Sequence, residues 1–130
     1  MARDSGAFTA ADARSAERII PMLDRLLIEA YPALLHGDLL SGNVMCVADG
    51  APMLIDPAVY FGHREMDLAM MQLFGGFPNA VFDIYDSLLP LDTGWQERIP
   101  LYQLYPLLVH VNFFGGSYTG RVLGIVRHFA

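Results

Sequence analysis

The chain has 130 residues, of which 54% are hydrophobic and only 17% are charged. Its formal net charge of -6 excludes the clustered basic surface with which proteins bind nucleic acids or anionic membranes. A single cysteine, Cys46, excludes an intramolecular disulfide framework and fits a reducing compartment. The first 18 residues are polar and alanine-rich rather than like a secretory signal, so we expect a cytoplasmic protein. We expect one domain spanning residues 1–130, with Cys46 packed in its core.

The N-terminal part predicts a disordered start followed by a helix. Residues 1–8 are expected to be disordered, and Thr9 with Asp12 has the spacing of a capping box. Apolar residues then recur at helical spacing to about Tyr31. Pro21 interrupts this pattern, so it either kinks the helix or occupies the first turn of a second one.

Short apolar runs follow Pro32 and predict strands at 33–35, 44–48 and 52–55. Asp49-Gly50 lies between the last two runs and indicates a tight β-hairpin. The remainder predicts helices over 64–74, 79–88 and 95–114 and a last helix from Ser117, with double glycines at 75–76 and 115–116 as helix stops. The helix over 95–114 is too interrupted by polar residues and prolines to span a membrane. We expect the aromatic residues of this helix to lie in the core, with the lining of a sugar site as the alternative: Trp95, Tyr102, Tyr105, Phe113 and Phe114.

The segment His36-Gly37-Asp38-Leu39-Leu40-Ser41-Gly42-Asn43, with Ile55-Asp56 thirteen residues after the Asn, is typical of a phosphotransferase catalytic loop. In that pattern Asp38 handles the proton of the substrate hydroxyl, and Asn43 and Asp56 hold magnesium. The predicted hairpin joins Asn43 to Asp56, and because a hairpin brings its two ends together, these residues can converge on one ion. An isolated Asp and Asn in a loop is more often simple turn chemistry.

Further residues near this loop are candidates for supporting the loop or for contacting the substrate. His36 is either a base or a brace that holds the loop backbone, and the second is favoured. Asp67 lies in the first turns of a helix, where it either stabilises the helix dipole or anchors the loop. Tyr60, His63 and Arg64 lie between Asp56 and that helix and are candidates for contacts with substrate or phosphate. Arg64 could instead pair with a buried carboxylate or be a solvated surface residue.

Two other classes of function are compatible with parts of the pattern. His36, Asp38, Asp56 and His63 are ligand types of a metal-dependent hydrolase, although this interpretation leaves Asn43 without a role. A non-catalytic module that binds a sugar-amine or a protein partner is the third possibility.

Several runs along the chain resemble the fructosamine kinase (ketosamine-3-kinase) family, which has a protein-kinase-like fold. The resemblance covers about residues 34–120 and rests on these runs: Leu35-His36-Gly37-Asp38-Leu39, Ser41-Gly42-Asn43, Ile55-Asp56-Pro57-Ala58, Gly62-His63-Arg64-Glu65, Asp67-Leu68-Ala69-Met70, Leu73-Phe74-Gly75-Gly76-Phe77-Pro78, Tyr102-Gln103-Leu104-Tyr105-Pro106-Leu107-Leu108 and Phe114-Gly115-Gly116-Ser117-Tyr118. The chain departs from the family at Leu40, where the family usually has Trp.

The resemblance implies an ATP-dependent, Mg²⁺-dependent kinase that phosphorylates the sugar 3-hydroxyl of ketosamines, either small molecules or glycated proteins, in the repair of glycation. By position, it makes Asp38 the catalytic base and Asn43 and Asp56 the magnesium ligands. The expected fold is α+β, a mainly helical C-terminal lobe whose small β-hairpin carries the catalytic loop. All eight basic residues are arginines, so the lysine that grips nucleotide phosphates is missing, together with the N-terminal nucleotide lobe. The chain alone is therefore expected to be inactive, and to form a homodimer through apolar surface that this lobe would cover.

Overall fold

A computed structural model describes residues 8–129, which fall into two compact units. One unit combines residues 1–29 with 100–130, and the other comprises residues 30–99. Residues 1–7 of the segment expected to be disordered lie outside the described residues. Within residues 8–129, no helix is both long and apolar enough to cross a bilayer.

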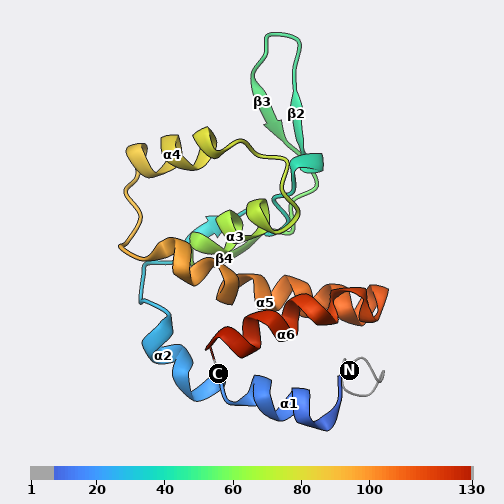
Figure 1. Cartoon of the computed structure of the whole chain (residues 1–130). Helices are drawn as coiled ribbons and strands as arrows, with labels where there is room; N and C mark the ends of the chain where they lie inside the picture. The colour runs from blue at the N-terminus through green and yellow to red at the C-terminus, as the bar shows by residue number, and fades with distance from the viewer. Residues whose placement is uncertain (1–7, 130) are drawn as a thin grey trace. The chain divides into compact units, whose positions relative to one another are not determined.

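The first unit begins with helix α1 (Ala10–Glu17), which the sequence predicts from its capping box (Figure 1). Asp12 N donates to Thr9 Oγ1 at 3.2 Å, and Thr9 N donates to Asp12 Oδ2 at 3.0 Å. The bonds from the Thr9 hydroxyl and backbone N–H lower the pKa of the Asp12 carboxyl. The start of this helix is therefore confirmed.

The helix expected to continue to Tyr31 is shorter than its apolar periodicity indicates. A 3₁₀ turn, η1 (Ile20–Met22), carries Pro21 in its first turn, and α2 (Leu23–Leu26) follows. The backbone is already extended at Leu27 (φ −99°, ψ 147°). Pro21 thus starts a new turn, as one of the two interpretations predicts, but residues 27–31 are not helical.

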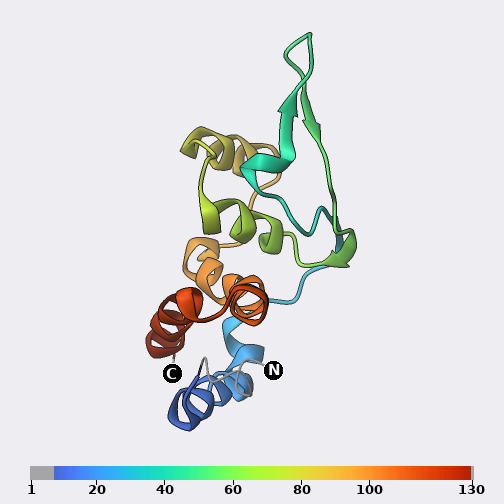
Figure 2. The same cartoon turned by 90° about the vertical axis from the view of Figure 1, so that its right-hand side faces the viewer.

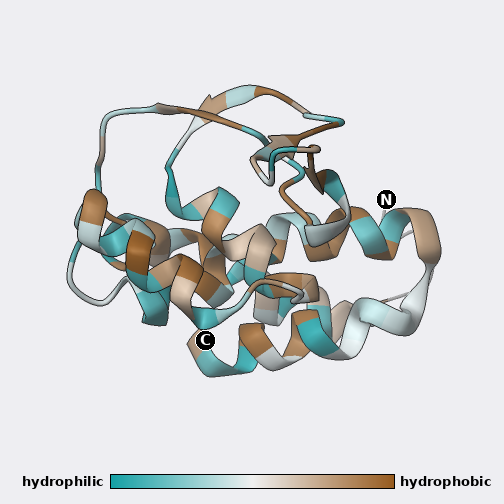
Figure 3. Cartoon of the chain, turned by 90° about the horizontal axis from the view of Figure 1, so that it is seen from above, coloured by the Kyte–Doolittle hydropathy of each residue, from teal (hydrophilic) through white to brown (hydrophobic). Residues whose placement is uncertain are grey.

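Helix α5 (Trp95–Phe114) contains the boundary between the units, and its C-terminal part joins η3 (Gly116–Tyr118) and α6 (Thr119–Phe129) in the first unit. Hydrophilic and hydrophobic segments alternate around α6, as expected for a helix with one buried face (Figure 3). The core of this unit has side chains no more than 2% exposed from both helices: Leu107, Val111, Val122 and Val126.

The aromatic residues of α5 do not all enter a core. Trp95 and Tyr102 are buried, as expected, but Tyr105, Phe113 and Phe114 are 67%, 78% and 69% exposed. The expectation for these three residues is wrong, because each lies on a helix face that no other described element covers in the structure.

The second unit contains two small antiparallel sheets. Strand β1 (Ala33–Leu35) pairs with β4 (Tyr60–Gly62), and β2 (Val44–Cys46) pairs with β3 (Pro52–Leu54). The β2–β3 hairpin turns at Asp49-Gly50, as predicted; its strands run side by side up to this turn (Figure 2). Strand β4 is not predicted, because three residues without a periodic pattern become a strand only through their distant partner.

Cys46 lies in a strand, as expected, but it is exposed rather than buried. The hairpin that contains it has no further strand on either side, since its sheet has two strands. A two-stranded sheet buries little surface by itself, and Met45 and Leu54 are also about half exposed in this hairpin.

Helices α3 (Glu65–Phe74) and α4 (Asn79–Leu88) complete the second unit and agree closely with the predicted ranges. Gly75 ends α3 with φ 73°, a left-handed value that glycine adopts readily. The face of α3 that carries Leu68, Ala69 and Leu73 is at most 3% exposed and forms the centre of this unit.

A buried ion pair fixes the beginning of α3. Glu65 is fully buried, and its carboxylate accepts hydrogen bonds from Arg98 Nε at 2.9 Å and Arg98 Nη2 at 2.6 Å. Arg98 Nη1 also donates to the Thr93 carbonyl at 2.9 Å. A bidentate pair with further carbonyl acceptors satisfies the charge that burial would otherwise leave in an apolar environment.

We predict that Glu65→Ala and Arg98→Ala each lower the free energy of unfolding by about 3–5 kcal/mol, because each leaves one buried charge without its partner. The double variant Glu65→Leu/Arg98→Met should lose much less than the sum of the single changes. Urea denaturation measures both effects. Glu97→Ala, at an exposed position of α5 next to Arg98, is the control. Single variants as stable as that control would contradict the role of the pair.

Candidate active site

The backbone at the start of the predicted catalytic loop is held by a carboxylate from α3. Asp67 Oδ2 accepts a hydrogen bond from His36 N at 2.7 Å, and Asp67 Oδ1 accepts one from Gly37 N at 2.9 Å. Asp67 lies in the first turn of α3. Both carboxylate oxygens therefore bond to the backbone of the loop. These bonds correspond to the interpretation of Asp67 as an anchor for the loop.

His36 connects this anchored backbone to the segment around Asp56. Its Nε2 lies 3.0 Å from the Ile55 carbonyl oxygen, which can only accept, so Nε2 carries the proton. Its own carbonyl accepts a bond from Ala58 N at 2.8 Å. The side chain and the backbone of His36 therefore hold both ends of the segment 55–58, with Asp56 between them.

Asp56 has a left-handed backbone conformation, with φ 50°. It is the only non-glycine residue with positive φ among residues 8–129. Asp adopts this region more readily than most residues, although the conformation still costs on the order of 1 kcal/mol and persists only where the surroundings impose it. The bonds from His36 on either side are such surroundings.

Asn43 lies next to Asp38 at the other end of the loop. Its Nδ2 donates to the Asp38 carbonyl at 2.8 Å and to Asp38 Oδ2 at 3.3 Å, and Oδ1 takes no part in either bond. The Asn43 carbonyl accepts a bond from Ile55 N at 3.0 Å, which continues the pairing of β2 and β3. The hairpin thus brings Asn43 beside Ile55, the residue that precedes Asp56, as the sequence predicts.

Gly37 allows close contact between the loop and the segment after Asp56. Its φ is +80°, and a Cβ added there would lie 2.1 Å from the Ala58 carbonyl oxygen and 3.0 Å from Tyr60 Cε1. The ring of Tyr60 therefore packs directly against the loop backbone.

His63 and Arg64, which follow Tyr60, form hydrogen bonds with other residues of the same unit. Arg64 Nη1 donates to the Leu89 carbonyl at 2.8 Å, and Nη2 donates to the Pro90 carbonyl. His63 Nδ1 accepts a bond from Glu65 N at 3.2 Å. Contacts of His63 and Arg64 with a substrate or a phosphate stay a prediction.

Sequence reasoning missed the backbone groups that complete this arrangement, which are the Ile55 carbonyl and the Ala58 N–H. Main-chain groups are the same in every residue, so only the pairing of elements identifies them. Within the described part of the chain, no group of three or more His, Cys, Asp or Glu side chains is arranged to hold a metal ion. This finding does not favour the ligand set suggested for a hydrolase.

Comparison with known proteins identifies the family. A family model described as fructosamine kinase matches residues 2–129. The chain belongs to the fructosamine kinase family.

Relatives of this fructosamine kinase family member are considerably longer than the chain. A probable ketoamine kinase of Enterococcus faecium is 47% identical over 116 residues, which are 89% of this chain and 41% of that protein. The mouse ketosamine-3-kinase is 46% identical over 109 residues, or 84% of this chain and 35% of the mouse protein. The chain therefore spans less than half the length of these relatives.

A solved structure from Thermobifida fusca, assigned as a fructosamine-3-kinase, matches the chain with a TM-score of 0.89 and 46% identity. The match covers 97% of this chain and 44% of that protein. The mainly helical α+β arrangement with small antiparallel sheets thus corresponds to part of a fructosamine kinase structure.

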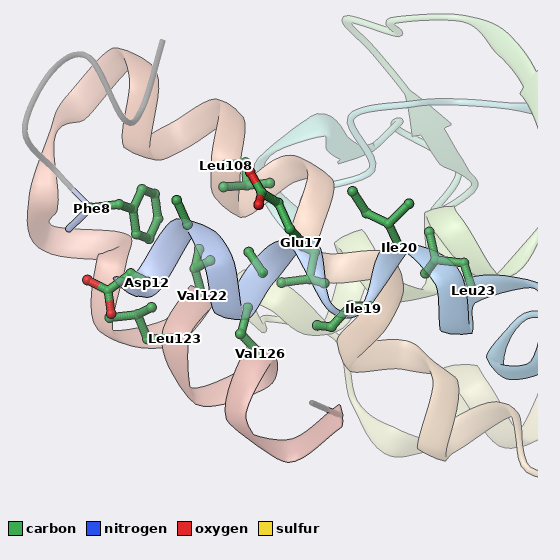
Figure 4. A pocket seen from close by; sticks show the side chains of 13 residues that line it. Phe8, Asp12, Glu17, Ile19, Ile20, Leu23, Leu108, Val122, Leu123 and Val126 are labelled. Atoms are coloured by element: carbon green, nitrogen blue, oxygen red, sulfur yellow. The ribbon is translucent and has the colours of Figure 1, made fainter. Parts of the chain in front are cut away.

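This fructosamine kinase family member also has an apolar cavity of about 310 Å³ in its first unit (Figure 4). The segment from α1 to α2 and the helices α5 and α6 line it, mostly with apolar side chains such as Ile19, Leu108 and Val122, and Asp12 and Glu17 are also part of the lining. None of the predicted site residues is part of its lining.

We predict that Gly37→Ala destabilises the chain by more than 1 kcal/mol, because Ala is strained at positive φ and its Cβ would overlap the Ala58 carbonyl. Gly42→Ala, in the same loop, is the matched control. Gly42 has no atom within 4 Å of an added Cβ and no positive φ, so this change should be nearly neutral. Thermal and urea denaturation compare the two, and equal effects would contradict the close approach.

Burial lowers the pKa of His63, with Glu65 opposing the shift and Arg98 adding to it. The unfolded chain, with a His pKa near 6.5, therefore binds more protons than the folded chain at pH values between the two pKa values. We predict that stability falls as the pH decreases below about 6.5 and that this loss continues down to the folded pKa. His63→Asn, which keeps an acceptor for Glu65 N, should remove this part of the pH dependence of unfolding. Parallel pH profiles for the two proteins would contradict the assignment.

Proposed function

We propose that this chain supplies the catalytic loop of an ATP-dependent kinase that phosphorylates the sugar 3-hydroxyl of ketosamines. The observation that carries the proposal is a network of hydrogen bonds in a fructosamine kinase family member. Asp67 accepts a bond from the loop backbone at His36, His36 bonds to Ile55 next to Asp56, and Asn43 bonds to Asp38. The names of the mouse and Enterococcus faecium relatives support ketosamines as the substrate class.

Asp38 is the proposed catalytic base. Its Oδ2 accepts a bond from Asn43 Nδ2, which restricts the rotation of the carboxylate and leaves Oδ1 to face a substrate hydroxyl. Phosphoryl transfer to an alcohol requires mainly that this hydroxyl is oriented and its proton accepted as the new bond forms. Because His36 Nδ1 lies 3.4 Å from Asp38 N, His36 also contributes to the orientation of Asp38.

Asn43 Oδ1 and the Asp56 carboxylate are the proposed ligands of Mg²⁺. Both are oxygen donors, which Mg²⁺ prefers, and Mg²⁺ usually binds through one or two protein ligands plus nucleotide phosphates rather than through a protein cage. When bound with ATP, Mg²⁺ would neutralise charge on the transferred phosphoryl group.

The chain corresponds, in this proposal, to the C-terminal lobe of a protein-kinase-like fold. Kinases of this type place a lysine on the nucleotide phosphates, and all eight basic residues of the 130 are arginines. The lysine must therefore come from outside these residues. We propose that the 130-residue chain alone turns over ketosamines very slowly.

Tyr60 is the proposed wall of the substrate site, because its ring packs against Gly37, next to Asp38, and remains 39% exposed. His63 accepts a bond from Glu65 N, and Arg64 donates to the Leu89 and Pro90 carbonyls after α4, so these bonds restrain the backbone that follows Tyr60. Small ketosamines and glycated proteins in the cytoplasm are the proposed substrates. The homodimer stays a prediction, supported by exposed apolar side chains such as Leu34 and Phe61 on the paired strands β1 and β4.

A chimera tests the proposed function. The 109-residue segment of the mouse ketosamine-3-kinase that aligns with this chain is replaced by the residues of this chain. The chimera should phosphorylate a ketosamine with ATP and Mg²⁺, and Asp38→Asn should reduce kcat by about 10²–10⁴-fold, the usual contribution of a general base. Asp83→Asn, at an exposed position of α4, is the charge-matched control and should leave kcat unchanged.

The assay also separates the alternatives. A folded chimera that binds a ketosamine without phosphorylating it would favour the non-catalytic module. Ketosamine phosphorylation that survives Asp38→Asn would overturn the role of Asp38. The 130-residue chain is assayed in parallel, and turnover equal to that of the chimera would contradict the need for a separate nucleotide lobe.

A further inference from the structure

The two glycines that follow α3 have different surroundings. Both have positive φ, 73° at Gly75 and 90° at Gly76. A Cβ added to Gly75 would meet nothing within 4 Å, whereas a Cβ added to Gly76 would lie 2.3 Å from Ser41 Oγ and 2.6 Å from Ser41 Cβ. The end of a helix needs one such glycine, and Gly75 provides it. The requirement for glycine at Gly76 therefore has a second cause, which is the contact with Ser41.

Ser41 belongs to the predicted catalytic loop. It opens the 3₁₀ turn η2 (Ser41–Asn43), so its backbone leads directly to Asn43. Asn43 N donates to the Leu40 carbonyl at 2.9 Å, and Leu40 N donates to the Asp38 carbonyl at 2.9 Å. A displacement of Ser41 is thereby transmitted through consecutive bonds to both candidate site residues.

Rotation of the Ser41 side chain cannot relieve the contact. Rotation about the Cα–Cβ bond would move Oγ, but Cβ would remain 2.6 Å from the added atom. Atoms this close are well inside van der Waals contact. A side chain at Gly76 must therefore displace the backbone of the loop or the backbone after α3.

We propose that Gly76 is a positioning residue, whose lack of a side chain sets the location of the Ser41–Asn43 turn. The effect on the loop follows from the contact alone. The effect on catalysis rests on the proposed function.

The test compares Gly76→Ala with Gly75→Ala in the 130-residue chain. Both variants place Ala at positive φ, so both should lose stability through backbone strain. Only Gly76→Ala should shift or broaden the amide resonances of Ser41–Asn43 in a ¹H–¹⁵N NMR spectrum. The side-chain amide of Asn43, which bonds to Asp38, should change with them.

A rescue separates positioning from strain. Ser41→Gly removes both atoms that the new Cβ would meet, so Ser41→Gly/Gly76→Ala should restore the wild-type resonances of Asn43. Ser41→Gly should have no such effect on Gly75→Ala. The rescue also keeps the test informative if Gly76→Ala alone folds poorly, because the double variant should fold.

The mouse-based chimera gives the catalytic readout. Gly76→Ala should reduce kcat by about 100-fold with little change in KM, as expected when a catalytic group is misplaced by about 1 Å, and Ser41→Gly should recover most of this loss. Unchanged loop resonances in Gly76→Ala, or a failure of Ser41→Gly to restore them, would overturn the positioning role. If the loop moves and Ser41→Gly restores it while Asp38→Asn leaves the chimera fully active, positioning stands and the proposed role of Asp38 as catalytic base fails.

Discussion

The carboxylate of Asp67 is the point on which the arrangement of the loop depends. It accepts the backbone N–H groups of His36 and Gly37, 30 or more residues away in sequence. These two N–H groups fix the start of the loop relative to α3. Because Glu65, two residues earlier, is held by Arg98 in a buried bidentate pair, the first turn of α3 is itself fixed. The position of the loop therefore follows from a charged pair that is remote from Asp38.

His36 connects the loop backbone that Asp67 holds to the segment around Asp56. His36 bonds to both the Ile55 carbonyl and the Ala58 N–H. Asp56, in the segment between them, adopts the unusual φ of 50°. Local strain of this kind is maintained only by its surroundings, and it is common at functional sites. The conformation of Asp56 is thus a consequence of hydrogen bonds made by the loop that carries Asp38.

Local patterns were reliable where the cause of the structure is local. The capping box at Thr9, the Asp49-Gly50 turn and helix α4 are all as predicted, because the groups that determine them lie within a few residues of one another. The errors concern burial and distant pairing. Cys46 and Phe113 are exposed although their residue types favour the core, since burial depends on which other element covers a face.

The sequence by itself determined the family, the order of most elements, and the residues Asp38, Asn43 and Asp56 as candidates on either side of a hairpin. Residue type and spacing are sufficient for these conclusions. Only the tertiary structure decided that Asp67 bonds to the loop, that strand β4 exists, and that Gly76 lies against Ser41. Each of these features joins segments that are far apart in the chain, and a one-dimensional pattern does not specify which of the many possible partners the folded chain selects.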